Sequence, residues 1–94
     1  MRVLNNSLIT GLAARARSDF EVAGWNVTDA SNYSGQNIPT STVYYRPGTG
    51  EEAAARNLAR TFDLKVEPRF AGLDGGPGVV VIVTNDYHPS GKAS

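Results

Sequence analysis

Val79-Val80-Val81-Ile82-Val83 is the stretch that decides the fold, because five consecutive branched apolar residues form the strongest strand signal in the chain. A strand with two apolar faces is typical of the interior of a sheet. The turn cluster Asp74-Gly75-Gly76-Pro77-Gly78 precedes it. Polar sequence follows from Thr84, and we expect residues 89–94 to be a disordered C-terminal tail.

Four shorter segments upstream also have the character of strands. Residues 2–5 and 25–28 are short extended candidates between turn residues. Residues 42–46 are rich in β-branched and aromatic side chains, and Pro47-Gly48 ends them. Lys65-Val66-Glu67 predicts a brief strand before a proline. The sheet should therefore have four or five strands.

Two segments predict amphipathic helices. From Leu8 to Ala23 apolar residues recur every three or four positions, and Gly24 is placed to end this helix in the left-handed conformation. Thr49-Gly50-Glu51-Glu52 has the spacing of a capping box, in which the threonine hydroxyl accepts one backbone amide and Glu52 reaches back to another. A second helix should begin there, with a buried face made of Ala55, Leu58, Ala59 and Phe62.

The order of these elements predicts an α/β domain in two layers. Two helices should lie on one face of a four- to five-stranded sheet in split β-α-β order, ferredoxin-like in outline, with a doubly wound sheet as the alternative. A chain of 94 residues has the size of one domain, which we place at residues 1–88. The sheet face without helices should stay uncovered and available to a ligand or to a second copy in a homodimer.

Composition excludes several classes of function. Nine basic residues balance nine acidic ones, so we expect no binding to nucleic acid. The chain has no cysteine and one histidine, which excludes disulfides and thiolate metal sites and leaves no basis for expecting a metal or another cofactor. No apolar run approaches the ~20 residues that cross a bilayer.

Several motifs resemble, in order and spacing, the LytR/CpsA/Psr C-terminal domain family. The resemblance runs from Arg2 to about Tyr87. The family commonly has Gly at the position of Asn6, and since Asn also tolerates a positive φ, we expect the turn to be kept. The motifs are Val3-Leu4-Asn5-Asn6-Ser7, Gly11-Leu12-Ala13, Ala23-Gly24-Trp25-Asn26-Val27, Thr42-Val43-Tyr44-Tyr45-Arg46-Pro47-Gly48, Ala53-Ala54-Ala55-Arg56-Asn57-Leu58-Ala59 and the strand Val79 to Val83.

The resemblance implies an extracytoplasmic domain of the bacterial cell envelope. Family members occur behind the catalytic domain of enzymes that attach glycopolymers to peptidoglycan, or alone behind one membrane anchor. This chain looks like the free-standing actinobacterial type, as in mycobacteria, whose N-terminal transmembrane anchor lies outside the present sequence. The family implies a non-catalytic scaffold that contacts cell-wall glycan, or a wall-polymer ligase of the LytR/CpsA/Psr type, and organises wall assembly.

Asn5-Asn6-Ser7 is the first candidate site, at the expected start of the first helix. Its backbone amides and hydroxyl are suited to an anion such as a phosphate or a sugar acid. The same residues are also good helix caps, which is the structural alternative. No lysine lies nearby to complete a phosphate site, so nucleotide binding is not expected.

The polar loop at residues 29–41 and the end of the following strand form the preferred binding surface. Flat aromatic rings stack on sugars, and their polar edges bond hydroxyls. Tyr44 and Tyr45 should point to opposite sides of their strand, so at most one faces the core. The alternative is an aromatic side chain packed under its own loop. The candidate side chains here are Trp25, Tyr33, Tyr44, Tyr45 and Arg46.

Groups for catalysis are sparse. A triad would depend on His88 alone, and no serine lies in a Gly-x-Ser-x-Gly setting. Glu51 and Glu52 are adjacent on a helix and point in different directions, and their place at a helix N-terminus explains them through the helix dipole. We expect no enzyme. A hydrolase or transferase acting on wall glycan, and a purely structural dimerisation domain, are the alternatives.

Overall fold

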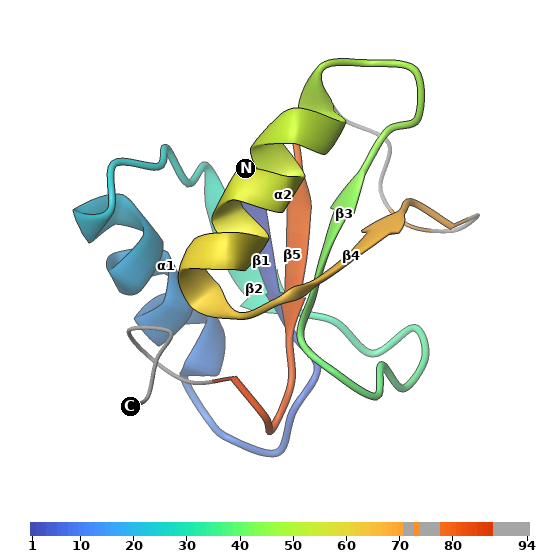
Figure 1. Cartoon of the computed structure of the whole chain (residues 1–94). Helices are drawn as coiled ribbons and strands as arrows, with labels where there is room; N and C mark the ends of the chain where they lie inside the picture. Colours follow the sequence, from blue (N-terminus) through green and yellow to red (C-terminus); the bar gives the residue numbers. More distant parts are fainter. Residues whose placement is uncertain (71–72, 74–77, 88–94) are drawn as a thin grey trace.

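The computed structural model describes residues 1–70, 73 and 78–87, and these form a two-layer α/β domain. Both helices pack on one face of a five-stranded sheet, which confirms the predicted fold class (Figure 1). The elements are β1 (Arg2–Asn5), α1 (Leu12–Val22), β2 (Asp29–Asn32), β3 (Thr42–Tyr45), α2 (Glu51–Phe62), β4 (Lys65–Pro68) and β5 (Val80–Val83).

The sheet has the strand order β2-β1-β5-β3-β4. β1 and β2 are parallel neighbours joined by α1, and β3 and β4 are parallel neighbours joined by α2. β5 is inserted between these two β-α-β units, parallel to β1 and antiparallel to β3. The last strand therefore splits the sheet, which is consistent with the ferredoxin-like outline.

β5 occupies the centre of the sheet because all four of its side chains are apolar and buried. Val81 and Val83 face the helices, whereas Val80 and Ile82 face the other side. Complete burial of one such side chain contributes about 1.5–3 kcal/mol. The strand that was predicted to be interior is interior.

The helix-side core joins α1, α2 and the sheet. The ring of Phe20 from α1 meets that of Phe62 from α2 edge to face, with ring centroids 4.7 Å apart. Tyr87, after β5, is buried against Phe20, and its hydroxyl donates to Asp19 Oδ2 at 2.8 Å. The face predicted for the second helix is confirmed as buried: Ala55, Leu58, Ala59 and Phe62.

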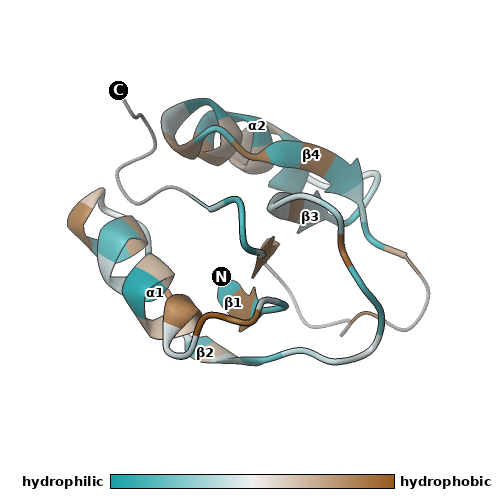
Figure 2. Cartoon of the chain, turned by 90° about the horizontal axis from the view of Figure 1, so that it is seen from below, coloured by the Kyte–Doolittle hydropathy of each residue, from teal (hydrophilic) through white to brown (hydrophobic). Residues whose placement is uncertain are grey.

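The opposite face of the sheet is covered, so the expectation of an open face is wrong. Residues 33–41, here named the crossing loop, leave β2 at one edge and must pass β1 and β5 to reach β3. Figure 2 shows this loop on the side of the sheet away from the helices. Its Ile38 packs on a buried apolar cluster with Leu4, Tyr44, Val80, Ile82 and Leu73. The homodimer remains a prediction, but the sheet face that suggested it is covered by the crossing loop.

The second strand lies four residues later than predicted, inside the segment expected to be loop. After α1 the chain first closes the helix end, where Trp25 N donates to Phe20 O at 3.0 Å. Thr28 N then bonds Met1 O at 2.8 Å, and Asp29 is the first residue in register with β1. Parallel pairing therefore decides the position of this strand, and local residue preference does not.

α1 begins at Leu12, not at Leu8, because the intervening residues form a turn of their own. Gly11 precedes the helix with a φ of 81°, and Gly24 follows it with a φ of 99°, as its predicted role requires. Asn6 is not among the residues with positive φ, so the conformational reason given for an asparagine at this position is wrong.

The capping box predicted at α2 is confirmed for the Thr49 hydroxyl and wrong for Glu52. The helix begins at Glu51, preceded by Gly50, and the Thr49 hydroxyl accepts the Glu51 amide at 3.1 Å. Glu51, not Glu52, reaches back along the chain: its Oε1 accepts Arg46 N at 2.9 Å, and its Oε2 accepts Arg46 Nε at 2.9 Å and Gly78 N at 2.8 Å. This carboxylate ties the start of α2 to the end of β3 and to the segment before β5.

Candidate functional site

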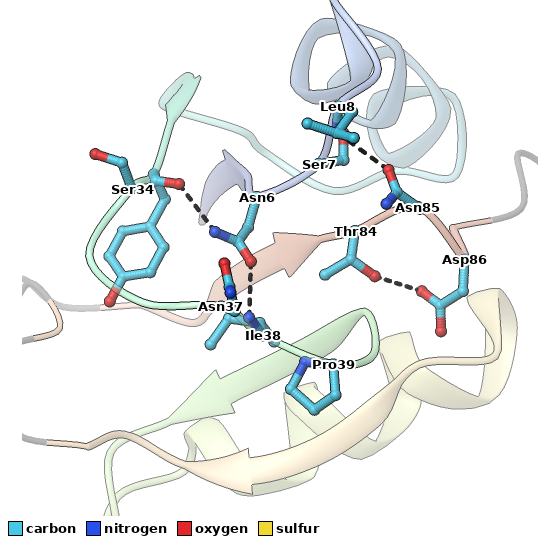
Figure 3. A pocket seen from close by; sticks show the side chains of 11 residues that line it. Asn6, Ser7, Leu8, Ser34, Asn37, Ile38, Pro39, Thr84, Asn85 and Asp86 are labelled. Carbon is cyan, nitrogen blue, oxygen red and sulfur yellow. Dashed lines mark hydrogen bonds between the residues drawn. The ribbon is translucent and has the colours of Figure 1, made fainter.

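A hollow of about 550 Å³ lies beyond the carboxyl ends of β1 and β5. In open α/β sheets this edge is the usual position of a ligand. We call it the main hollow, and Figure 3 shows its walls, which come from three separate segments of the chain. The lining residues are Asn6, Ser7 and Leu8 after β1, Tyr33, Ser34, Asn37, Ile38 and Pro39 in the crossing loop, and Thr84, Asn85 and Asp86 after β5.

A smaller hollow of about 340 Å³, the side hollow, adjoins the main hollow. The two share Ser7, Leu8, Tyr33 and Ser34, so together they extend along both sides of Leu8 and Tyr33. The side hollow is completed by residues of the turn before α1 and of the β2 end: Asn5, Ile9, Thr10, Gly11 and Asn32.

Asn6 fixes one end of the crossing loop. Its Oδ1 accepts the Ile38 amide at 2.7 Å, and its Nδ2 donates to Tyr33 O at 3.1 Å and to Gln36 O at 3.0 Å. One primary amide thus satisfies three backbone groups of a segment that has no secondary structure to satisfy them. The side chain of Asn6 holds the wall of the main hollow in place.

Asp86 fixes the other end of the loop. Its Oδ1 accepts Ser41 N at 2.9 Å, Ser41 Oγ at 2.7 Å and Thr84 Oγ1 at 2.7 Å, while its Oδ2 accepts Thr40 Oγ1 at 3.0 Å. Burial works to raise the pKa of Asp86, but these hydrogen bonds outweigh it, and the pKa lies below the ordinary value. The carboxylate is therefore ionised at neutral pH and occupied by the protein's own donors.

The hydrogen bonds of Asn5 and Ser7 belong to the turn before α1. Asn5 Nδ2 donates to Ile9 O at 2.9 Å, the Ser7 hydroxyl donates to Asn5 Oδ1 at 2.5 Å, and Ile9 N donates to that hydroxyl oxygen at 3.0 Å. Because α1 starts only at Leu12, these residues cap a turn and not a helix. Ser7 lines both hollows, and Asn5 lines the side hollow.

Several polar groups on the walls have no partner within the described part of the chain. The side chains of Ser34 and Asn37 are exposed and form no hydrogen bond there. Asn85 uses its Oδ1 to accept the Leu8 amide at 3.1 Å and keeps its NH₂ group free. Leu8 itself has a side chain at the rim and is 92% exposed. An uncommitted set of amides and hydroxyls thus surrounds an exposed aliphatic residue.

Tyr45 and Arg46 lie at the opposite end of the sheet. β3 is antiparallel to β5, so Tyr44 is level with Val80, and Tyr45 and Arg46 follow beyond it, away from the main hollow. The single surface expected from the crossing loop and the Tyr-Tyr-Arg sequence is therefore divided: Tyr44 lines a separate depression with residues 36–40 of the loop, and Tyr45 and Arg46 are not part of it. The structure brings together Asn5, Asn6, Ser7 and Tyr33, and separates them from Tyr45 and Arg46.

Tyr44, Tyr45 and Arg46 are held by packing within the domain. Tyr44 is 6% exposed and meets Phe70 edge to face at 5.3 Å between ring centroids, and burial raises its pKa. Tyr45 and Trp25 are partly buried against the helix-side core. Arg46 pairs with Glu51. The two tyrosines do point to opposite sides, as predicted, and Tyr44 adopts the structural alternative of an aromatic packed under its own loop.

Groups for acid–base or metal chemistry do not converge at this edge. Asp86 is the one carboxylate lining either hollow, and the described residues contain no cluster of three His, Asp or Glu side chains. Burial works to raise the pKa of Glu51, and its bonds from Arg46 and Gly78 lower it overall. His88 and the tail at 89–94 lie outside the described residues. Within the described ranges, neither helix is long and apolar enough to cross a membrane.

Sequence reasoning named the crossing-loop wall of the main hollow together with Asn6 and Ser7, but it missed the wall that follows β5. Leu8, Thr84, Asn85 and the role of Asp86 were not predicted. The available signal was the run Thr84-Asn85-Asp86 directly after the central strand, because polar residues at the carboxyl end of a buried strand commonly line a site.

The fold and the hollows define a small α/β domain that is suited to bind a ligand at the sheet edge formed by the carboxyl ends of β1 and β5. The chain belongs to the family described as LytR cell envelope-related transcriptional attenuator, which matches residues 1–87. This confirms the resemblance to the LytR/CpsA/Psr C-terminal domains, and proteins of this family are associated with the cell envelope. The family and its relatives suggest a role without catalysis.

Two relatives support the assignment. The chain is 42% identical over 85 residues to the "Vesiculogenesis and immune response regulator" of Mycobacterium tuberculosis, an alignment that covers 89% of this chain and 52% of that protein. The chain thus spans about half the length of this curated relative. It is also similar to the solution structure of the C-terminal domain of RV0431, with a TM-score of 0.63 and 42% identity over 89% of this chain and 70% of that one.

Proposed function

We propose that this chain is a non-catalytic binding and scaffolding module of the bacterial cell envelope. It holds cell-wall glycan, either peptidoglycan or a polymer attached to it, or a wall-polymer ligase of the LytR/CpsA/Psr type, and so organises wall assembly and envelope integrity. It works outside the cytoplasm, held at the cell envelope. The relative named for vesiculogenesis extends the proposal: by holding the wall, such a domain affects the release of vesicles.

The main hollow carries the proposal. It lies at the edge of the sheet where α/β domains bind ligands, and it presents amide and hydroxyl groups that are not used elsewhere in the described chain. A rigid wall, fixed at both ends by Asn6 and Asp86, avoids the entropic cost of ordering a loop when a ligand binds. These features favour recognition over chemistry.

The geometry gives less support to a glycan hydrolase. Cleavage of a glycosidic bond needs two facing carboxyl groups, one of them kept protonated. Asp86 has a lowered pKa and has its oxygens turned to Thr40, Ser41 and Thr84. Glu51 lies at the other end of the sheet, bonded to Arg46 and Gly78. Both of these carboxylates are thus engaged in structural hydrogen bonds.

Co-sedimentation with insoluble peptidoglycan tests the proposal. The chain is incubated with purified sacculi, with and without their attached polymers, and crosslinked in parallel to an envelope fraction. Retention on sacculi, or a crosslinked wall-polymer ligase, supports the proposal. Absence of both overturns it, as does release of soluble glycan by the chain.

A further inference from the structure

We infer that the main and side hollows form one binding groove for an uncharged, N-acetylated oligosaccharide chain, and that the groove selects against anionic polymers. This inference rests on the proposed function and narrows it in two ways. It assigns the ligand to the edge formed by the carboxyl ends of β1, β2 and β5, and it names the ligand's chemistry.

The described walls of the main and side hollows carry no positive charge to attract an anionic polymer. Neither lysine nor arginine is among the described residues that line the two hollows. The one charged side chain is Asp86, which is ionised at neutral pH. A phosphodiester or uronic acid polymer would meet this negative charge with no cation to offset it, and partner selection by charge works through such repulsion. A neutral ligand meets no such repulsion.

The second argument is the type of polar group. Asn37 and Asn85 each offer a side-chain amide, and Ser34 offers a hydroxyl, none of which is satisfied by the described chain except Asn85 Oδ1. An amide both donates and accepts, so it pairs with sugar hydroxyls and with an N-acetyl group. Figure 3 shows these side chains spread around the hollow, as needed for contacts along a chain.

The third argument is the exposed apolar surface between the hollows. Leu8 is 92% exposed and belongs to the walls of both. Tyr33 also lines both hollows, and its ring lies so close to Gly35 that a Cβ there would come within 2.5 Å of the tyrosine Oη. An aromatic ring and an exposed aliphatic residue match the apolar face of a pyranose and the methyl of an acetyl group. Hollows on both sides leave room for successive sugar units.

The test is an NMR titration of the ¹⁵N-labelled chain with three soluble tetrasaccharides. N-acetylchitotetraose is neutral, its fully deacetylated form is cationic, and a hyaluronan tetrasaccharide carries acetyl groups on two of its four sugars and carboxylates on the other two. We expect N-acetylchitotetraose to shift the side-chain amides of Asn37 and Asn85 and the backbone amide of Leu8. The hyaluronan fragment should bind at least about tenfold more weakly.

Two pairs of variants locate the site. Asn37→Ala and Leu8→Ala should each weaken binding of N-acetylchitotetraose about fivefold, the effect of one hydrogen bond or one small apolar contact. Gln36→Ala and Val22→Ala are the matched controls and should change affinity less than about twofold. Gln36 neighbours Asn37 but lines neither the main nor the side hollow, and Val22 is an aliphatic residue of α1 that is 87% exposed. All four side chains are exposed, so the fold should persist, which the dispersion of each spectrum checks.

The outcomes separate this inference from the proposed function. Shifts confined to other surfaces, equal binding of hyaluronan, or equal effects of the paired variants overturn the groove. Shifts caused only by the peptide stem of a muropeptide also overturn it. If the wild type is retained on sacculi and Asn37→Ala and Leu8→Ala are retained equally well, the inference fails while the proposed function stands. If sacculi and envelope crosslinking both give nothing, the proposed function fails.

Discussion

Replacing Asn6 with alanine should destabilise the domain by releasing the crossing loop that its side chain holds. The substitution removes three hydrogen bonds, to Ile38 N and to the carbonyl oxygens of Tyr33 and Gln36. Each contributes about 1 kcal/mol net, and the Ile38 amide is left beside a buried side chain with no replacement acceptor. The expected loss is about 2–3 kcal/mol, or a fall in Tm of about 10–20 °C for a domain of this size.

Urea denaturation with wild type, Asn6→Ala and Asn37→Ala measures this loss. Asn37 lies in the crossing loop, and its side chain makes no hydrogen bond with the described chain, so its replacement should change the free energy of unfolding by less than about 0.5 kcal/mol. Hydrogen exchange of the Ile38 amide should accelerate in Asn6→Ala alone. Equal stability of the two variants, together with unchanged protection of Ile38, would refute the assignment of Asn6 as the residue that fixes the loop.

Three further predictions concern the carboxylates and a buried tyrosine. Glu51→Ala removes the acceptor for Arg46 N, Arg46 Nε and Gly78 N, and it should lower the free energy of unfolding by about 2–3 kcal/mol. Glu52→Ala breaks one exposed ion pair with Arg56 and should lower it by less than about 0.5 kcal/mol. Chemical denaturation measures both, and equal losses would contradict the role of Glu51 as the carboxylate that ties α2 to the sheet. Folding lowers the pKa values of Asp86 and Glu51, so their ionised forms stabilise the folded domain above the unfolded pKa values of about 3.9 and 4.3. This stabilisation is lost as the pH falls through the pKa values of the folded state. In Asp86→Asn the free energy of unfolding should therefore fall less steeply with decreasing pH. Burial and the hydrogen bond to Asp19 raise the pKa of Tyr87, so the neutral hydroxyl contributes fully to the stability of the fold below the unfolded pKa of about 10, and this contribution is lost as the pH rises above it. Tyr87→Phe should be about 1 kcal/mol less stable than the wild type at pH 7. It should also lose less stability than the wild type between about pH 9 and 11.

The elements were predictable where the periodicity of apolar residues decides the structure. Val79 to Val83 could only be an interior strand, and the apolar positions of α2 could only face the sheet. Lys65-Val66-Glu67 was also recognised as a strand, extended by Pro68 at the sheet edge. Residues Asp29–Asn32 were not, because a polar strand forms there only through parallel pairing with β1. That pairing depends on strand order, which local sequence does not encode.

The site was predictable in part, for a similar reason. Asn5-Asn6-Ser7 and Tyr33 were singled out as polar or aromatic residues near turns, and they do meet at one edge. Tyr45 and Arg46 were grouped with Tyr33 and the crossing loop because they follow that loop closely in sequence. The antiparallel direction of β3 relative to β5 sends them to the other end of the sheet. Asp86 holds the crossing loop through donors more than 40 residues away, at Thr40 and Ser41, and local sequence does not indicate these partners.

The most direct test of a non-catalytic, glycan-binding domain is an NMR titration of the labelled chain with solubilised, neutral wall glycan. Chromatography of the recovered glycan completes the test. The account predicts shifts at residues 6–8, 33–39 and 84–86, with the glycan recovered at its original chain length. Shortened or chemically altered glycan would contradict it, and so would shifts gathered around Tyr45, Arg46 and Glu51 at the far end of the sheet.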